Sequence, residues 1–470
     1  MSAPATTEKK YLKWYQKLAY GSGDLASNCS YGLVSSFVLL YLTGTLGLDS
    51  AIIGSLMLAS KVLDGISDVI FGTLIDRTHS KLGKARPWML FGQVGVSLCL
   101  FLLFAIPAGS TTMQYIYFFI VYTALNAVFY TANGIAYSSL VALITKNNNE
   151  RVQLGSFRFM FAVVTNIFMG FAVTGMVEKF GSGAAGWRTT ALIFAIVGLV
   201  VNTISCLAVK ELPEEELSDN TCEAAEEGKA VAKEKKHGFA ETAKILIHNK
   251  YYLMILAIYI VYYIMSNLTT GAGVFCATYY WGDGSLLGQF SMMKMFPVII
   301  ALAIAPVLIK KTGSMQKVNF WGYAISSVLG IPMIYFAMQK NLSMFLLFMF
   351  IKGIFAGTLS GSLNALIAEA SGYTTRTTGV HMNGMMYSCS SLGVKVGGGI
   401  GTAAVGWLLK LGGFVGTATV QSESAIRMIF NLYITFPFVI GIIITVLLAF
   451  LDVEKANKKW DAEHKKEAQA

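Results

Sequence analysis

Long apolar segments alternate with short polar connections along almost the whole chain. A helix needs about 20 mainly apolar residues to cross the hydrocarbon core of a bilayer. The pattern therefore predicts an all-α membrane protein with twelve transmembrane helices. The predicted segments are residues 18–44, 51–75, 88–107, 114–144, 156–178, 188–209, 251–280, 285–309, 319–338, 342–369, 382–410 and 427–451.

Basic residues gather in every second connection. Lys and Arg beside transmembrane helices mark the cytoplasmic side. Both termini are therefore predicted to be cytoplasmic, as an even number of helices requires. The basic connections are residues 9–17, 77–86, 146–151, 310–317 and the tail at 455–466.

The longest polar segment, residues 210–250, divides the chain in half. We interpret it as a solvated cytoplasmic loop, and a regulatory docking site is the alternative. A basic turn containing glycine follows the second predicted helix at 83–86 and the eighth at 310–313, which indicates an internal duplication. The predicted domains are a cytoplasmic N-terminal segment 1–17, a six-helix bundle 18–209, the central loop 210–250, a second six-helix bundle 251–451 and a cytoplasmic tail 452–470.

Composition excludes a soluble protein. Of 470 residues, 55% are hydrophobic and 13% are charged, against about 25% charged in soluble domains. The net charge of +10 fits basic loops better than nucleic-acid binding. The six cysteines are scattered without metal-ligand spacing, and the N-terminus carries no secretory signal pattern. All five histidines fall in predicted loops or tails, which argues against haem or a histidine relay, and no cofactor is expected.

Two aspartates lie deep in the second predicted helix. Asp64 and Asp68 are four residues apart, so both carboxylates share one helix face. Two anions there repel strongly in a low dielectric. Either one carboxylate keeps a proton, or both bind a hard cation, which prefers oxygen ligands. A structural ion pair with Lys61 is the alternative.

Other ionisable residues also fall at membrane depth, where each costs at least about 2.5–3.5 kcal/mol. Asp24 is either a buried acceptor for sugar hydroxyls or part of a half-exposed helix end. Arg158 is either an anchor at the membrane edge or a bidentate ligand contact. Lys395 lies well inside the eleventh helix and needs an acidic partner. Glycines 397–399 and 401 beside it allow another helix to approach closely.

Two further lysines, Lys294 and Lys352, are also deep, either balancing charge or contacting an anionic substrate. Aromatic rings can stack on the apolar faces of sugars, although most rings in this chain are expected to serve packing. The aromatic candidates are Tyr130, Tyr137, Tyr279, Tyr280 and Trp281.

Several motifs resemble a known family. They are GDLASN in the first helix, KVLDGISDVIFGTLIDRTHSKLGKARPWMLFG across the second and third, and YSSLVALIT with ERVQLGSFRFMFA across the fourth and fifth. GWR at 186–188 and TTGVHMNGMMYS before the eleventh helix fit as well. Together they resemble the glycoside–pentoside–hexuronide:cation symporters of the major facilitator superfamily, over nearly the whole chain.

The resemblance implies a major-facilitator fold of two pseudo-symmetric six-helix bundles that work by alternating access. It implies a cation site at Asp64, Asp68 and Thr131, the two carboxylates being metal ligands if the ion is Na⁺. It also implies that Lys395 couples the cation and substrate sites. The implied substrate residues are Asp24, Arg158, Tyr130, Ser391 and Lys395, and the implied gating loop holds Asp76, Arg77, Lys84 and Arg86.

The chain departs from the family pattern at several positions. Gly134 stands where the family often has an acid or amide that holds the sugar, and Asn133 is expected to substitute for it in part. Ser67 stands where some sodium-using relatives have Asn. The segment Gly372-Tyr373-Thr374-Thr375 has lost two carboxylates. The sequence therefore leaves open which sugar and which coupling cation the protein binds.

The sequence thus predicts a transporter and not an enzyme. It is expected to import a glycoside, pentoside or uronide by symport with Na⁺ or H⁺, Li⁺ being possible. An antiporter or exporter on the same fold and a non-transporting nutrient sensor are the alternatives. The predicted partners are a small sugar, a monovalent cation and the lipid bilayer, without nucleic acid, and the protein is expected to be a monomer in a bacterial plasma or inner membrane.

Overall fold

The computed structural model describes residues 9–213, 245–378, 383–418 and 420–467, and within these ranges it contains helices and no strand. The chain forms two compact units. Unit 1 comprises Met1–Lys233 with Val415–Ala418, and unit 2 comprises Glu234–Phe414 with Thr419–Ala470. The division falls inside the predicted central loop, of which residues 214–244 lie outside the described ranges.

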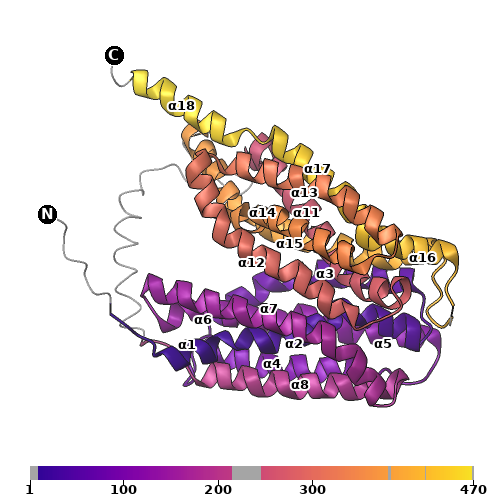
Figure 1. Cartoon of the computed structure of the whole chain (residues 1–470). Helices are drawn as coiled ribbons and strands as arrows, with labels where there is room; N and C mark the ends of the chain where they lie inside the picture. The colour runs from indigo at the N-terminus through magenta and orange to yellow at the C-terminus, as the bar shows by residue number, and fades with distance from the viewer. Residues whose placement is uncertain (1–8, 214–244, 379–382, 419, 468–470) are drawn as a thin grey trace. The chain divides into compact units, whose positions relative to one another are not determined.

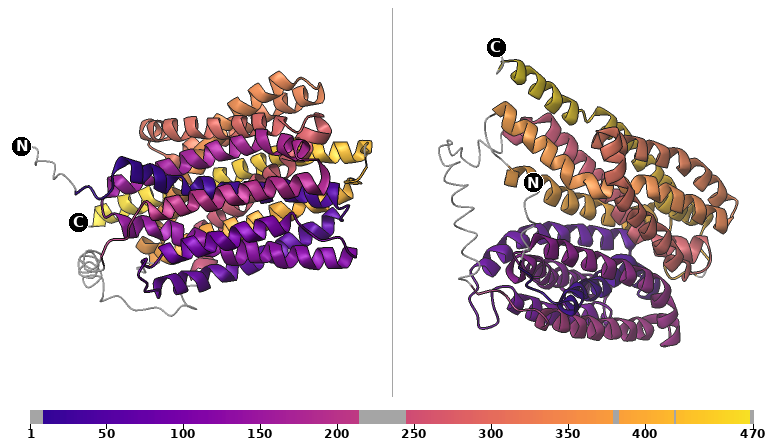
Figure 2. Two further views of the ribbon diagram at one scale, coloured as in Figure 1. Left: turned by 90° about the horizontal axis from the view of Figure 1, so that it is seen from below. Right: turned by 60° about the vertical axis from the view of Figure 1, so that its left-hand side comes forward.

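The long helices of unit 1 lie side by side (Figures 1 and 2). The first predicted segment is divided at Ser22 into α1 and α2, and the segment predicted at 114–144 contains a π-helical stretch. The helices are α1 (Trp14–Gly21), α2 (Gly23–Leu40), η1 (Tyr41–Thr45), α3 (Ser50–Asp76), α4 (Arg86–Leu103), α5 (Thr111–Thr123), η2 (Ala124–Tyr130), α6 (Thr131–Ile144), α7 (Asn148–Lys179) and α8 (Gly183–Leu207).

Unit 2 has a similar make-up. Its α14 continues nine residues beyond the predicted end at 369, so the segment 372–375 is helical and not part of a loop. The helices are α11 (Lys250–Phe275), η3 (Cys276–Tyr280), α12 (Leu286–Thr312), α13 (Met315–Met338), α14 (Leu342–Thr378), α15 (Asn383–Leu411), α16 (Glu423–Phe430), η4 (Asn431–Thr435), α17 (Phe436–Phe450) and α18 (Val453–Glu467).

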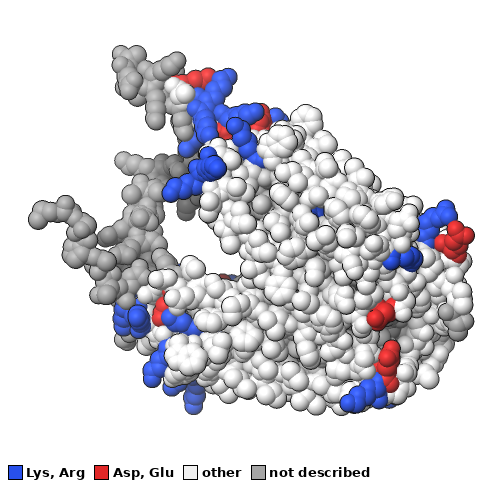
Figure 3. All heavy atoms as spheres, in the orientation of Figure 1, with Lys and Arg blue, Asp and Glu red and all other residues white. Residues whose placement is uncertain are grey.

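Eleven helical segments of the described chain are long and apolar enough to cross a membrane. The 27-residue α3, which carries Lys61, Asp64 and Asp68, is not among the eleven. At 1.5 Å per residue it is about 40 Å long, which exceeds the roughly 30 Å hydrocarbon core. With α3 the segments number twelve, as predicted. On the face shown in Figure 3, charged residues gather towards the ends of the helices and the surface between them is almost entirely uncharged.

The first long helix of each unit ends in the same way. Both end in a π-helix, η1 or η3, followed by a glycine with positive φ. In unit 1, Leu46 N–H donates to the Tyr41 carbonyl, and in unit 2, Trp281 N–H donates to the Cys276 carbonyl. Gly47 (φ 69°) and Gly282 (φ 80°) come next. This shared ending supports the duplication expected from the sequence.

The helix that carries Lys395 packs closely on α11. A Cβ atom added at Gly397 would lie 2.4 Å from the Ile260 carbonyl oxygen, and one at Gly401 would lie 2.6 Å from that of Ile264. Side chains at these two positions would push α15 away from α11. The close helix approach predicted from the glycines is therefore confirmed.

The carboxylate of Glu211, just after α8, caps the basic turn at residues 83–86. Glu211 accepts hydrogen bonds from the backbone N–H groups of residues 84, 85 and 86, at 2.7, 2.9 and 3.1 Å. These groups open α4, where an anion is favoured. Gly83 has φ 111°, and a Cβ there would lie 2.4 Å from the Glu211 carboxyl carbon. In unit 2, Glu454 accepts from Ser314 Oγ and Gln316 N–H at the start of α13.

Within the predicted gating loop, Asp76 ends α3 and its side chain is exposed. Arg77 follows as the C-cap residue. Arg86 donates from Nε to the Cys206 carbonyl at 3.2 Å, which joins the loop to α8. The turn is thus fixed to the end of α8 through Glu211 and Arg86, and the role of these residues in gating stays a prediction.

We predict that Glu211→Ala lowers the melting temperature of the purified protein. Three N–H groups at the start of α4 lose their acceptor, and loss of a cap costs about 0.5–2 kcal/mol. Glu423→Ala is the matched control, because the Glu423 side chain is 88% exposed and pairs with Arg427 of its own helix. Equal melting temperatures for the two variants would contradict the capping role.

Candidate functional site

An ion pair joins the predicted substrate residues in unit 1. Nε of Arg158 on α7 donates to Oδ2 of Asp24 on α2 at 2.6 Å, with 26% and 16% of the two side chains exposed. The guanidinium carbon of Arg158 lies 4.2 Å from the ring centroid of Tyr137 on α6. Tyr137 Oη lies 3.5 Å from the same Asp24 oxygen. The structure thus brings Asp24 and Arg158 together over an aromatic face.

Tyr137 is held in place from behind. Its hydroxyl donates to the Tyr20 carbonyl at 2.8 Å, and Tyr20 Oη donates to the Tyr137 carbonyl at 2.5 Å. Ser205 Oγ on α8 donates to the Tyr20 carbonyl as well. Tyr20 and Tyr137 are 0% and 2% exposed, so their rings pack in the core of unit 1. They form a fixed aromatic surface beneath the Arg158 guanidinium. Tyr137 therefore positions the ion pair, although the sequence offered it as a stacking ring.

One helical turn along α2, Asn28 extends this polar surface. Asn166 Nδ2 on α7 donates to Asn28 Oδ1 at 3.0 Å, and Asn28 Nδ2 donates to the Asp24 carbonyl at 2.7 Å. Sequence reasoning missed both asparagines. The spacing of four between Asp24 and Asn28 was the available signal, since it places both on one face of α2.

The predicted cation residues Asp64 and Thr131 are in contact. Thr131 Oγ1 at the start of α6 donates to Asp64 Oδ1 on α3 at 2.7 Å. The same hydroxyl lies 2.9 Å from the carbonyl oxygen of Asn126. Asn126 belongs to the π-helix η2, and such stretches are common at functional sites because they free backbone groups. Two oxygen atoms, one from α3 and one from η2, therefore lie within hydrogen-bond distance of the Thr131 hydroxyl of α6.

A cationic side chain accompanies this cluster. Lys61 Nζ lies 3.5 Å from Asp64 Oδ2, so the alternative ion pair considered from the sequence is present. Ser67 Oγ donates to the Asp64 carbonyl at 2.9 Å. Asp68 lies half-buried one turn further along α3. Among the described residues, no group of three or more His, Cys, Asp and Glu side chains is arranged to hold a metal ion. Any cation here would therefore rely on hydroxyl and carbonyl oxygens as well.

The other predicted residues of η2 and α6 differ in their surroundings. Tyr130 is half-buried and stacks on Tyr31 of α2, with 5.7 Å between ring centroids. Asn133 is 1% exposed, and its Nδ2 donates to Gln93 Oε1 of α4 at 2.9 Å. Gly134 faces open space, with no atom within 4 Å of an added Cβ. In this structure Asn133 therefore contacts α4. The open space lies at the next residue, Gly134.

Unit 2 supplies the remaining predicted site residues. Ser391 is exposed and Lys395 half-buried, both on α15. Of the aromatic candidates, Tyr279 packs against Phe414 and Trp281 against Phe345, with centroids 5.2 and 5.4 Å apart. The Tyr280 carbonyl accepts a hydrogen bond from Lys340 Nζ. These three rings thus pack within unit 2.

The arrangement in unit 1 can bind two kinds of ligand. The Asp24–Arg158 pair offers a carboxylate acceptor and a guanidinium donor, which match the hydroxyl groups of a polyol. The Asp64–Thr131–Asn126 oxygens suit a proton or a hard cation. Both groups contact α6, one through Thr131 and the other through Tyr137, and these two residues are about 9 Å apart along the helix axis at 1.5 Å per residue.

We predict that Arg158→Gln lowers the melting temperature more than the double variant Asp24→Asn, Arg158→Gln. The single change leaves a carboxylate unmatched in a largely buried setting, and removing one partner of a buried pair is more destabilising than removing both. The exposed pair Glu423–Arg427, 88% and 73% exposed, is the matched control. If Arg158→Gln alone melts no lower than the double variant, the ion pair does not hold α2 to α7.

Comparison with known proteins places the chain in a family. The model of the family described as MFS/sugar transport protein matches residues 19–455. An isoprimeverose transporter of Lactiplantibacillus pentosus is 26% identical over 98% of this chain and 94% of its own length. A putative glycoside/cation symporter of Escherichia coli is 24% identical over 95% and 93%. A putative 2,3-dihydroxypropane-1-sulfonate exporter of Escherichia coli is 26% identical over 95% and 93%.

Solved structures show the same fold. A bacterial homologue of the lysosomal transporter Spinster, in an inward-facing and unoccupied conformation, has a TM-score of 0.69 at 13% identity and covers 95% of this chain and 98% of its own. The predicted major-facilitator fold and the resemblance to the symporters are confirmed. The chain belongs to the MFS/sugar transport protein family, the glycoside–pentoside–hexuronide:cation symporters of the major facilitator superfamily, and is a multi-pass membrane transporter and not an enzyme.

Proposed function

We propose that this transporter imports a sugar, either a glycoside, a pentoside or a uronide, together with Na⁺ or H⁺ by alternating access. The observation that carries the proposal is the contact of α6 with two separate polar groups, Asp64 through Thr131 and Asp24 through Tyr137. Relatives named as an isoprimeverose transporter and a glycoside/cation symporter agree with it. Basic connections favour cytoplasmic termini in a bacterial cell membrane, and the protein acts as a monomer.

The cation enters at Asp64, Asp68 and Thr131. Before it arrives, Lys61 neutralises part of the negative charge on Asp64, at 3.5 Å. A proton on Asp64 releases Lys61, and Na⁺ instead takes oxygen ligands from Asp64, Thr131 and the Asn126 carbonyl, in keeping with its preference for hard oxygen donors. Asp64, Asp68 and Lys61 together carry a formal charge of −1, so either event brings the cluster to zero net charge in the bilayer interior, where unmatched charge is costly.

The substrate binds beside the Asp24–Arg158 pair. Its hydroxyl groups donate to Asp24 and accept from Arg158, replacing part of the contact that the two side chains make with each other. Tyr130 offers a ring for the apolar face of the sugar. The resemblance adds Ser391 and Lys395 of unit 2 as substrate residues, with Lys395 also coupling the two ligands, whereas Asn133 contacts α4 and is left out.

Coupling follows from the shared helix. A cation that changes how Thr131 is held shifts α6, and a substrate that changes how Tyr137 meets Asp24 shifts the same helix. Two ligands that bias one element affect each other's affinity by equal factors. The doubly loaded and the empty carrier change conformation readily, because a singly loaded carrier keeps a buried group unmatched.

An exporter on the same fold is the second candidate, favoured by the similarity to the putative sulfonate exporter. Right-side-out membrane vesicles separate the two directions. Import by symport predicts that an inward cation gradient drives accumulation of labelled sugar in right-side-out vesicles. Accumulation driven by an outward cation gradient instead would assign antiport. A nutrient sensor would show no flux in proteoliposomes under either gradient.

We predict that Thr131→Val weakens cation-driven uptake at least tenfold and that Thr131→Ser retains most of it. The valine has the shape of threonine without the hydroxyl, and a hydrogen bond to a charged group contributes about 1.5–3 kcal/mol. The measurement is uptake against cation concentration in proteoliposomes. Equal uptake by the two variants would show that the Thr131 hydroxyl is not part of the cation site.

Asp64→Cys and Asp68→Cys are each expected to abolish cation-driven uptake and to leave measurable sugar binding, because the substrate residues Asp24 and Arg158 are untouched. Asp283→Cys is a control on a polar connection of unit 2. Normal accumulation by either α3 variant would place the cation site elsewhere.

A further inference from the structure

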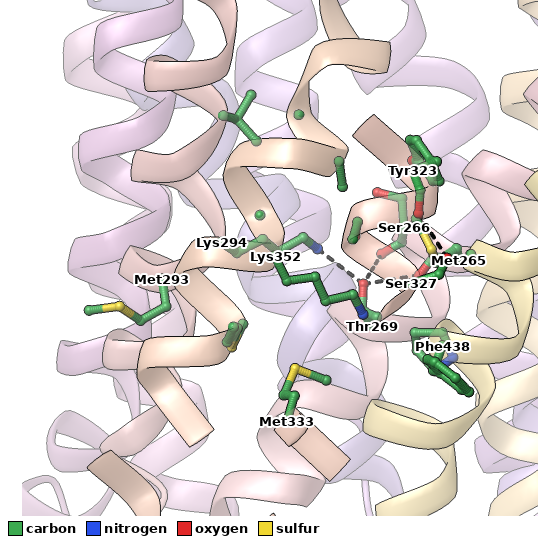
Figure 4. A pocket seen from close by; sticks show the side chains of 18 of the residues that line it. Met265, Ser266, Thr269, Met293, Lys294, Tyr323, Ser327, Met333, Lys352 and Phe438 are labelled. Carbon is green, nitrogen blue, oxygen red and sulfur yellow. Dashed lines mark hydrogen bonds between the residues drawn. The ribbon is translucent and has the colours of Figure 1, made fainter. Parts of the chain in front are cut away.

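Unit 2 contains a cavity of its own. It has a volume of about 180 Å³ and is walled by residues of α11, α12, α13, α14 and α17 (Figure 4). Drug-sized ligands occupy pockets of roughly 300–1,000 Å³, so this cavity suits a smaller group. Every residue that lines it belongs to unit 2, and none of them is among the ligand-binding residues proposed above.

Two lysines project into this cavity. Lys294 of α12 donates from Nζ to Thr269 Oγ1 and Thr270 Oγ1 of α11, both at 3.2 Å. Lys352 of α14 makes no hydrogen bond or ion pair with any residue that the structure describes, and in Figure 4 both lysine side chains point towards Thr269. The two ammonium groups therefore approach one hydroxyl from different helices.

The cavity holds hydrogen-bond donors, but no carboxylate stands among the described residues that line it. The described residues that line it include serine, threonine and tyrosine hydroxyls but no Asp or Glu. Tyr323 Oη is buried and has no hydrogen-bond partner among the described residues. Methionines 265, 293, 333 and 349 and Phe438 form much of the remaining wall. The polar groups are thus cationic or neutral, in largely apolar surroundings.

This arrangement is electrostatically incomplete. Like charges repel strongly where the dielectric is low, and a buried cation without an anionic partner is costly. Two ammonium groups and a free hydroxyl form a set of donors, and the complementary ligand is an anion with several acceptor oxygens. Carboxylate and sulfonate groups have that form, and the volume admits the acid group with a short carbon skeleton.

We propose that Lys294 and Lys352 form a binding site for the carboxylate or sulfonate group of a small organic anion, inside the C-terminal bundle. Tyr323 and Thr269 supply further hydroxyl contacts. The proposal rests on the transport function only in taking this anion to be a substrate, and the binding site itself is tested without transport.

The test measures binding to the purified full chain in detergent by isothermal titration calorimetry. The probes are glucuronate and a three-carbon hydroxyalkyl sulfonate, with glucose as the neutral match and inorganic sulfate as the free anion. The variants are Lys294→Met and Lys352→Met, with Lys352→Arg to keep the charge. Lys310→Gln is the control, because Lys310 is an exposed lysine on the same helix as Lys294.

We expect at least one organic acid to bind the wild type and Lys310→Gln, with glucose binding far more weakly. Each methionine variant should bind that acid at least about tenfold more weakly, which corresponds to the loss of one buried charge contact. Lys352→Arg should retain most of the affinity. A melting temperature at or above that of wild type would show that the methionine variants are folded, since apolar residues replace unmatched charges.

If both methionine variants bind the organic acids as tightly as the wild type does, Lys294 and Lys352 do not form the binding site. Binding of sulfate without either organic acid overturns the substrate class and assigns the lysines to a free inorganic anion. Organic-acid binding that depends on the lysines, in a protein without cation-driven uptake, supports the site and refutes the symport proposal. Cation-driven uptake of a neutral sugar that is unaffected by the methionine variants, with no acid bound, supports symport and refutes the site.

Discussion

The placement of ionisable groups inside an apolar bundle is the constraint on which the rest of this structure depends. Each such group needs a partner within the protein or from a bound ligand, because hydrocarbon offers none. In unit 1, Arg158 lies 2.6 Å from Asp24, and both Thr131 and Lys61 contact Asp64. These contacts connect α2 to α7 and α3 to α6. Under the proposed function, these polar pairs are where the ligands bind, and the helices they connect are those that respond.

The helix α6 and the π-helix before it bring these contacts together. The π-helical stretch Ala124–Tyr130 places the Asn126 carbonyl against the Thr131 hydroxyl, which also reaches Asp64. Six residues later, Tyr137 lies under Arg158 and against the backbone of Tyr20. A rigid helix with one ligand group near each position transmits a change at one to the other. No long chain of intermediate residues is required.

The two units share an architecture but differ in their deep charges. Unit 1 pairs acids with cations, as in Asp24 with Arg158 and Asp64 with Lys61, whereas the deep candidates of unit 2 are the lysines Lys294, Lys352 and Lys395. Yet the caps at Glu211 and Glu454 and the paired π-helical endings are repeated. Duplication therefore accounts for the scaffold, and later divergence of the interior side chains accounts for the chemistry. A carrier that couples a cation to a polar substrate needs such asymmetry.

The sequence by itself determined the class, the helix number, the two-unit division and the ionisable candidates, because apolar length and the cost of buried charge are properties of local sequence. Family motifs added the pairing of Asp64 with Thr131. Tertiary structure alone decided that Tyr137 supports Arg158, that Asn133 faces Gln93 while Gly134 faces open space, and that Lys294 and Lys352 share a cavity. These facts depend on which helix faces which, and on π-helical turns that shift a helix face, so the 3.6-residue pattern of one segment does not contain them.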